Sequence, residues 1–132
     1  MRQMKGKEAG ELIQYRKKRE VNDLKKLETM EQAQEVIQSQ PLSLLYISQP
    51  NCSVCHSLLP QVEELLEDYP KITSIHLDAK EVPEVAGQFS VMTVPAILIF
   101  AEGKEMFRKA RFVPMGELNM QLAKFNHFIN ED

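Results

Sequence analysis

The spacing of apolar residues switches repeatedly along the chain between the pattern of a strand and the pattern of a helix. Short apolar runs that suit buried strands, such as Leu42 to Ile47, alternate with stretches in which apolar residues recur every three or four positions, such as Leu58 to Tyr69. The predicted elements are, in order, a weak edge strand at 23–28, a helix between Thr29 and Pro41, a strand at 42–47, a helix at 53–69, a strand at 72–78, a short helix at 83–89, a strand at 96–100, a Glu102-Gly103 turn, a strand at 104–112 and a helix at 115–129. Strands that alternate with helices predict an α/β fold, with helices on both faces of a sheet.

Local signals divide the chain into an extension and one domain. Thr29 and Gln32 have the spacing of a capping box, in which each side chain bonds an amide at the start of a helix. Residues 7–19 predict a short additional helix whose apolar stripe is thin. We therefore expect an N-terminal helical or flexible extension at 1–20, followed by a single domain at 21–132.

Composition and charge narrow the class of protein. With 132 residues, of which 43% are hydrophobic and 27% charged, the chain has the size and balance of one globular domain. A net charge of -3 argues against a nucleic-acid-binding protein, which needs a basic surface. The longest apolar run, Val94 to Ala101, is much shorter than a transmembrane helix, and residues 1–9 lack the apolar stretch of a signal peptide. We expect a cytoplasmic protein that binds neither nucleic acid nor membrane.

The chain has two cysteines, Cys52 and Cys55, which lie three positions apart. Structural disulfides are rare in a reducing cytosol, so a close pair is typical of a catalytic, redox-sensing or metal-binding site. Cys52 falls where a predicted strand ends and a helix begins, and the helix dipole there stabilises the thiolate that attacks disulfides. Cys55 lies one turn further along, within reach of the resulting mixed disulfide. The pair predicts thiol–disulfide exchange, with Cys52 as the nucleophile and Cys55 as the resolving thiol.

Several features together resemble the thioredoxin family, and the resemblance covers about residues 23 to 130. The features are the core strand and short loop before the cysteines, Pro60 five residues after the second cysteine, Thr93-Val94-Pro95 about forty residues after the pair, Gly103 in the hairpin turn and Gly116 near the start of the last helix. Each of these signals is weak by itself. Their joint order and spacing are the reason for identifying the chain as a thioredoxin-like protein.

The resemblance implies a three-layer α/β/α sandwich with a central mixed sheet. It also implies a cis peptide bond before Pro95 and an extended client segment paired with the backbone of Val94, which makes Thr93, Val94 and Pro95 the candidate substrate-binding residues. The electrons reside on the two sulfurs, so we expect no dissociable cofactor. The implied partners are client proteins with disulfides and a reductase or other thiol donor, in the service of electron transport and cell redox homeostasis. We expect the chain to act as a monomer.

One departure from the family pattern concerns proton transfer. Tyr46 stands six residues before Cys52, where thioredoxins bury an aspartate assigned as a base for the resolving thiol. Ser74 occupies the place of the lysine that partners this aspartate. Because an unpaired buried carboxylate is costly, the loss of both residues together is self-consistent. Proton transfer from Cys55 would then need water, the Tyr46 hydroxyl or the substrate.

Other departures lie around the cysteines. Ser53 and Val54 separate them where thioredoxin has glycine and proline, and the chain has no tryptophan, so the family's reduction potential cannot be carried over. Arg111 replaces a glycine that thioredoxins usually place beside the cysteine surface; it either shifts substrate choice towards acidic partners or is a solvated strand-end residue. His56, directly after the pair, is a candidate for tuning the nearby thiolate.

Three other interpretations fit part of the sequence. The cysteine pair followed by His56 matches the short motif for covalent haem attachment, although the α/β pattern and the apparent lack of an export signal disfavour it. A zinc site would need His76 or His127 as well, and both lie in distant predicted elements, so we expect no metal. The third interpretation is a redox-inactive or regulatory thioredoxin-fold binding module, or adaptor. Adaptors need no cysteine pair, so the two cysteines in the catalytic places favour catalysis.

Overall fold

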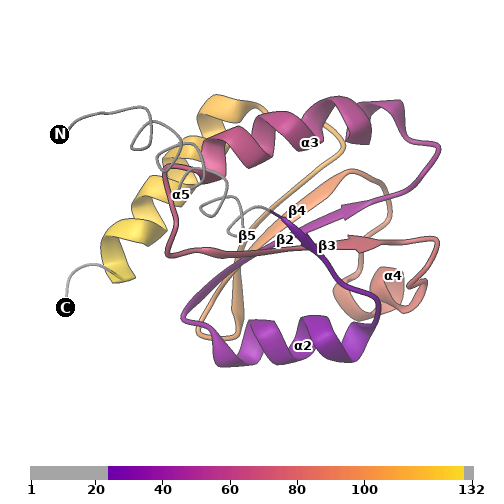
Figure 1. Cartoon of the computed structure of the whole chain (residues 1–132), viewed down its shortest axis with the longest axis horizontal. Helices are drawn as coiled ribbons and strands as arrows, with labels where there is room; N and C mark the ends of the chain where they lie inside the picture. The colour runs from indigo at the N-terminus through magenta and orange to yellow at the C-terminus, as the bar shows by residue number, and fades with distance from the viewer. Residues whose placement is uncertain (1–23, 130–132) are drawn as a thin grey trace, which may run out of the picture.

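The computed structural model describes residues 24–129, in which a sheet lies between two layers of helices (Figure 1). The strands are β1 (Lys25–Lys26), β2 (Leu42–Ser48), β3 (Thr73–Asp78), β4 (Ala96–Ala101) and β5 (Lys104–Ala110). The helices are α2 (Met30–Ser39), α3 (Ser53–Leu66), α4 (Glu84–Phe89) and α5 (Met115–Ile129). This order of elements confirms the order predicted from the apolar pattern. The extension predicted at 1–20 lies outside the described residues.

The five strands that the structure describes form one mixed sheet in the order β1-β3-β2-β4-β5. β2 runs parallel to β3 and antiparallel to β4, and β5 returns antiparallel to β4 as the second arm of a hairpin. β1, predicted at 23–28, has only two exposed residues at the edge of the sheet. β2 lies at the centre with every residue buried. The predicted three-layer α/β/α sandwich with a central mixed sheet is confirmed.

Alternate residues of the central strand face two separate hydrophobic cores. Leu45 and Ile47 pack with α2 and α4 on one face, whereas Leu44 and Tyr46 pack with α3 and α5 on the other. Figure 1 shows the same division, with α3 and α5 above the sheet and α2 and α4 below it. Each fully buried aliphatic side chain contributes about 1.5–3 kcal/mol. The two cores hold both helical layers against the sheet and so fix where α3 begins.

Besides the short β1, two elements end earlier than the sequence predicts. α3 ends at Leu66 rather than Tyr69, because the amides of 67–69 bond carbonyls three residues earlier and so leave the α-helical pattern. β5 ends at Ala110, two residues before its predicted end. There Arg111 takes a φ of 71°, a left-handed conformation that a strand cannot contain. Both early endings are therefore changes of backbone conformation rather than losses of packing.

Candidate active site

Cys52 and Cys55 lie where the chain passes from β2 into α3. Cys52 is the N-cap residue of α3, and its Sγ accepts a hydrogen bond from the Cys55 amide at 3.1 Å. The two residues form a disulfide, with their Cα atoms 5.2 Å apart. Residues three apart in a helical turn lie on the same side, so the turn brings the two sulfurs together.

The two cysteines differ in exposure. Cys52 is half-buried, whereas Cys55 is only 3% exposed. A disulfide from solution can therefore approach Cys52, while the Cys55 sulfur is within reach of little besides its neighbour. When the bridge is reduced, the unpaired amides and the dipole at the start of α3 favour a thiolate at Cys52. This is the arrangement that a nucleophile and a resolving thiol need.

Tyr46 lies directly beneath the cysteine pair. Its side chain is fully buried, and its hydroxyl donates a hydrogen bond to the Cys55 carbonyl oxygen at 2.6 Å. Burial raises the pKa of Tyr46 to about 12, and the carboxylate of Glu63 adds to the increase. At neutral pH the Tyr46 phenol stays protonated and donates its hydrogen bond to the backbone. Tyr46 therefore fixes the first turn of α3 and is poorly suited to accept a proton from Cys55.

His76 lies beside Tyr46 on the neighbouring strand, a position that the sequence pattern did not predict. The register of β2 and β3 sets His76 opposite Tyr46, with ring centroids 5.1 Å apart, and its Nε2 shares a 2.6 Å hydrogen bond with the Ser48 hydroxyl. Burial lowers the pKa of His76, and the charge of Lys26 lowers it further. Ser74 lies opposite Leu44 instead, and its buried Oγ has no hydrogen-bond partner in the described part of the chain. The signal that was missed is the parallel register, which a single sequence does not show.

The loop before β4 contains the three predicted substrate-binding residues. The peptide bond between Val94 and Pro95 is cis, Pro95 is buried, Val94 is half-buried and Thr93 is exposed. The amide of Arg111 donates a hydrogen bond to the Pro95 carbonyl at 2.6 Å. This bond joins the end of β5 to the cis-proline loop. Arg111, which the family pattern alone marked as a candidate site residue, therefore lies next to the cis-proline loop.

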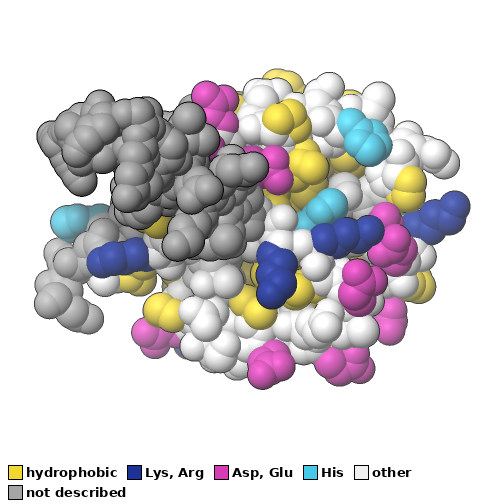
Figure 2. All heavy atoms as spheres, viewed as in Figure 1, with side chains coloured by type: hydrophobic (Ala, Val, Ile, Leu, Met, Phe, Trp, Pro, Cys, Tyr) yellow, Lys and Arg dark blue, Asp and Glu magenta, His cyan; other side chains and the backbone are white. Residues whose placement is uncertain are grey.

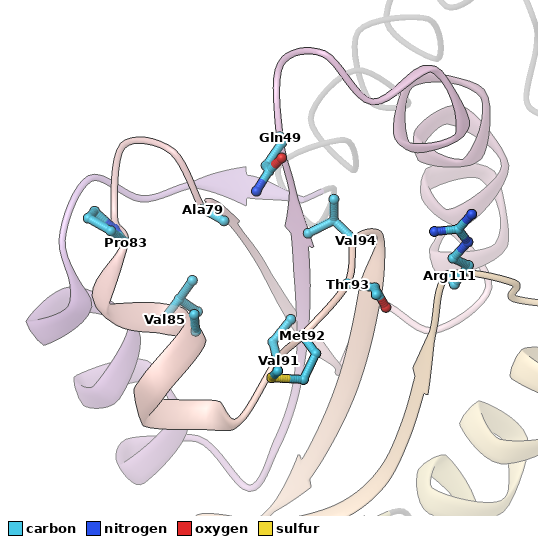
Figure 3. A pocket seen from close by; sticks show the side chains of 10 residues that line it. Gln49, Ala79, Pro83, Val85, Val91, Met92, Thr93, Val94 and Arg111 are labelled. Atoms are coloured by element: carbon cyan, nitrogen blue, oxygen red, sulfur yellow. The ribbon is translucent and has the colours of Figure 1, made fainter.

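A pocket of about 420 Å³ opens beside this loop (Figure 3). Figure 3 shows Gln49 and Val94 between the β5 side of the pocket, where Arg111 lies, and the α4 side, where Pro83 and Val85 lie. Gln49 comes from the loop just before the cysteines. The pocket therefore connects the cysteine loop, the cis-proline loop and the end of β5 in one concave surface.

The remaining candidates lie apart from one another. His56, in the exposed first turn of α3, donates a 2.9 Å hydrogen bond from Nε2 to the Pro50 carbonyl and so joins the helix to the preceding loop. His76 lies on β3 and His127 on α5. In the region 24–129 no group of three or more His, Cys, Asp or Glu side chains could hold a metal ion. None of the helices in this region is both long enough and apolar enough to cross a membrane.

A disulfide at the start of a helix, in a mixed-sheet sandwich with a cis proline, defines the class of thiol–disulfide oxidoreductases of the thioredoxin fold. The model of the family described as Thioredoxin matches residues 23–124, so the chain belongs to the thioredoxin family. Membership of this family and the bonded cysteine pair support oxidoreductase activity.

Individual relatives agree with this assignment. The chain is 42% identical over 98 residues to Thioredoxin-like protein YdfQ of Bacillus subtilis (strain 168), a match that covers 74% of this chain and 88% of the relative. It is 30% identical over 92 residues to Thioredoxin 1 of Nostoc, a match that covers 69% of this chain and 86% of the relative. The solution structure of oxidised thioredoxin from Plasmodium falciparum has a TM-score of 0.72 at 19% identity, covering 79% of this chain and 99% of the other. Thioredoxin from Trypanosoma brucei brucei has a TM-score of 0.72 at 17% identity, and the match covers 78% of this chain and 90% of the other. At these identities the structures show a shared fold.

Proposed function

We propose that the protein exchanges disulfides with client proteins, with Cys52 as the attacking thiol and Cys55 as the resolving thiol. The observation that carries the proposal is the difference in exposure between two sulfurs close enough to bond. Only Cys52 is open to a partner of protein size. The reaction that such a pair supports is a two-step transfer of a disulfide.

In the reducing direction, the Cys52 thiolate attacks one sulfur of a client disulfide. A Cys52–client mixed disulfide forms, the client bond breaks, and the other client sulfur leaves as a thiolate that takes up a proton. The Cys55 thiolate then attacks the Cys52 sulfur, forms the intramolecular disulfide and releases the second client thiol. Two electrons and two protons pass to the client in each turnover, and a thiol donor or a reductase returns them to the pair. No dissociable cofactor takes part in these steps.

The proton of Cys55 passes to water or to the departing client thiolate in this proposal. The Tyr46 hydroxyl is excluded as the base because it donates to the Cys55 carbonyl and its pKa is raised to about 12. Resolution therefore depends on the solvent that reaches the mixed disulfide rather than on a buried carboxylate. We expect the rate of this step to rise with pH as the Cys55 thiol ionises.

The client binds as an added strand beside the cis-proline loop. β4 begins at Ala96, so the backbone of Val94 lies outside the strand ladder and is open to an extended segment. Thr93 and Val94 then present the segment to Cys52, while buried Pro95 fixes the loop.

We further propose that the chain works as a monomer in the cytoplasm, on client proteins rather than on nucleic acid or membrane.

The test compares pre-reduced wild type with the Cys52→Ser and Cys55→Ser variants, using release of thiol from a peptide disulfide. Cys52→Ser loses activity by on the order of a hundredfold or more, because a serine hydroxyl does not ionise as a thiol does. Cys55→Ser still attacks but accumulates a mixed disulfide, which non-reducing mass spectrometry detects. The matched control is Ser57→Ala, at an exposed position on the same helix, which keeps wild-type activity. Full activity in Cys52→Ser would exclude Cys52 as the nucleophile. Binding of clients without any exchange in wild type would favour the adaptor interpretation.

A further inference from the structure

Arg111 occupies a backbone conformation that favours glycine. Its φ is 71°, in the left-handed region, where a side chain has a steric cost. The 2.6 Å hydrogen bond from its amide to the Pro95 carbonyl holds the backbone in place despite this cost. The chain thus carries a long cationic side chain at a strained position fixed to the cis-proline loop.

Arg108, three residues earlier on the same strand, is fully engaged by its neighbours. Its guanidinium bonds the Glu105 carboxylate at 2.6 and 2.9 Å and the carbonyls of Phe89 and Ser90 at 2.6 and 3.0 Å. The Arg111 guanidinium makes no hydrogen bond or ion pair with any residue in 24–129. Arg108 therefore joins β5 to the end of α4, whereas the Arg111 guanidinium has no partner among the described residues.

Arg111 lines the β5 side of the pocket beside the cis-proline loop (Figure 3). Among the described residues that line this pocket none is acidic, and Arg111 is the only charged one. The hydroxyl of Thr93 and the amide of Gln49 add polar groups, while Val91 and Val94 supply apolar wall. The β5 side of the pocket therefore suits an anionic group that belongs to a partly apolar segment.

Acidic residues on the α4 side of the pocket favour one orientation of such a segment, with its anionic group towards β5. Glu84 lies in the first turn of α4, next to the pocket wall, and Figure 2 shows acidic side chains gathered over α2 and α4. A carboxylate would be repelled near Glu84 and attracted near Arg111. The net charge of the chain is -3, so attraction of an acidic client has to be local.

We propose that Arg111 selects clients that carry an aspartate or glutamate beside the cysteine attacked by Cys52. This inference rests on the proposed exchange function and specifies its substrate class. The client segment pairs with the backbone near Val94, and its carboxylate accepts hydrogen bonds from the Arg111 guanidinium. Arg111 acts in recognition and not in the transfer of electrons.

The test uses three disulfide-linked peptides that differ only in having Glu, Gln or Lys next to the cysteine, each made with that residue before and after the cysteine. The measured quantity is the second-order rate constant for their reduction by pre-reduced protein. In one of the two registers, we expect wild type to prefer the Glu peptide over the Gln peptide by about fivefold, the effect of an exposed ion pair worth about 1 kcal/mol. The Lys peptide reacts more slowly than both. The preference falls in 0.5 M salt, which screens an exposed pair.

Matched variants assign the preference to one side chain. Arg111→Gln keeps the same backbone and Cβ but lowers the Glu-to-Gln ratio to about one, whereas Arg111→Lys keeps a ratio above one. The control is Lys104→Gln, which removes a positive charge at the other end of β5 and leaves the ratio at its wild-type value. Equal rates for all peptides in both registers, or a preference that survives in Arg111→Gln, overturn the inference while the exchange function stands. If wild type reduces none of the peptides, the exchange function fails and the inference fails with it.

Discussion

The face of the sheet covered by α2 and α4 and the face covered by α3 and α5 are buried to the same degree, but their side chains offer different chemistry. The first presents Leu45 and Ile47 from the central strand, with Ser43 as a polar side chain that has no partner among the described residues. The second presents Tyr46, with His76 from the neighbouring strand beside it. Adjacent residues of one strand thus serve two different cores.

The difference shows how the sheet is joined to the cysteine chemistry. On the α3 side, a hydrogen bond from Tyr46 reaches the backbone of Cys55, and a ring contact reaches from Tyr46 to His76. No described contact of the α2 side reaches either cysteine. We infer that changes on the α2 side alter stability alone, whereas changes on the α3 side also alter the exchange reaction.

The largest expected effect comes from Leu45→Ala on the α2 side. Removing this fully buried side chain leaves a cavity and lowers the free energy of unfolding by about 2–5 kcal/mol. Urea denaturation measures the loss, and Leu44→Ala, an equally buried leucine on the other face, is the matched control with a loss in the same range. In the folded Leu45→Ala protein, the equilibrium constant for thiol–disulfide exchange between the Cys52–Cys55 pair and glutathione stays at the wild-type value. A shift in that constant would contradict the inference that changes on the α2 side alter stability alone.

Tyr46→Phe has a smaller effect on stability but reaches the cysteines. It leaves the Cys55 carbonyl without its buried donor, which costs about 1–3 kcal/mol of unfolding free energy. Because the first turn of α3 is then held less firmly, we expect the glutathione equilibrium of the pair to shift by a few-fold, and redox titration measures this shift.

The matched control for Tyr46→Phe is Tyr69→Phe. Its hydroxyl also donates a 2.6 Å hydrogen bond, to Asn119 Oδ1, at a half-buried position away from the cysteines. We expect the control to leave the redox equilibrium unchanged. Equal redox shifts in both variants would contradict a specific link between Tyr46 and Cys55.

The smallest expected effect is a pH dependence due to His76. Burial lowers the folded-state pKa of this histidine below its ordinary 6.5, so the unfolded chain binds a proton more readily than the folded chain does. Its contribution to stability is therefore complete above about pH 6.5 and declines as the pH falls below that value. Urea denaturation between pH 7.5 and 5 detects the decline, and His76→Asn removes it. A slope that persists in His76→Asn would contradict the assignment.

Local signals in the sequence predicted much of the fold. The capping box is formed, with the Thr29 hydroxyl accepting from the Gln32 amide at 3.1 Å and the Gln32 side chain accepting from the Thr29 amide at 3.2 Å. The last helix has the predicted bounds, Met115–Ile129. These features depend on residues within a few positions of one another, which is why a single sequence reveals them. The close spacing of Cys52 and Cys55 belongs to the same class of signal.

The chain by itself determined the elements, the two reactive sulfurs and their place at the start of a helix, because each depends on short-range spacing and backbone preference. The tertiary structure alone decided that His76 lies beside Tyr46, that the Tyr46 hydroxyl bonds the Cys55 carbonyl, and that Arg111 borders a pocket next to Pro95. Those contacts join elements brought together by strand register and helix packing. Register is fixed by the sum of many apolar contacts across the sheet, so no local pattern in the sequence encodes it.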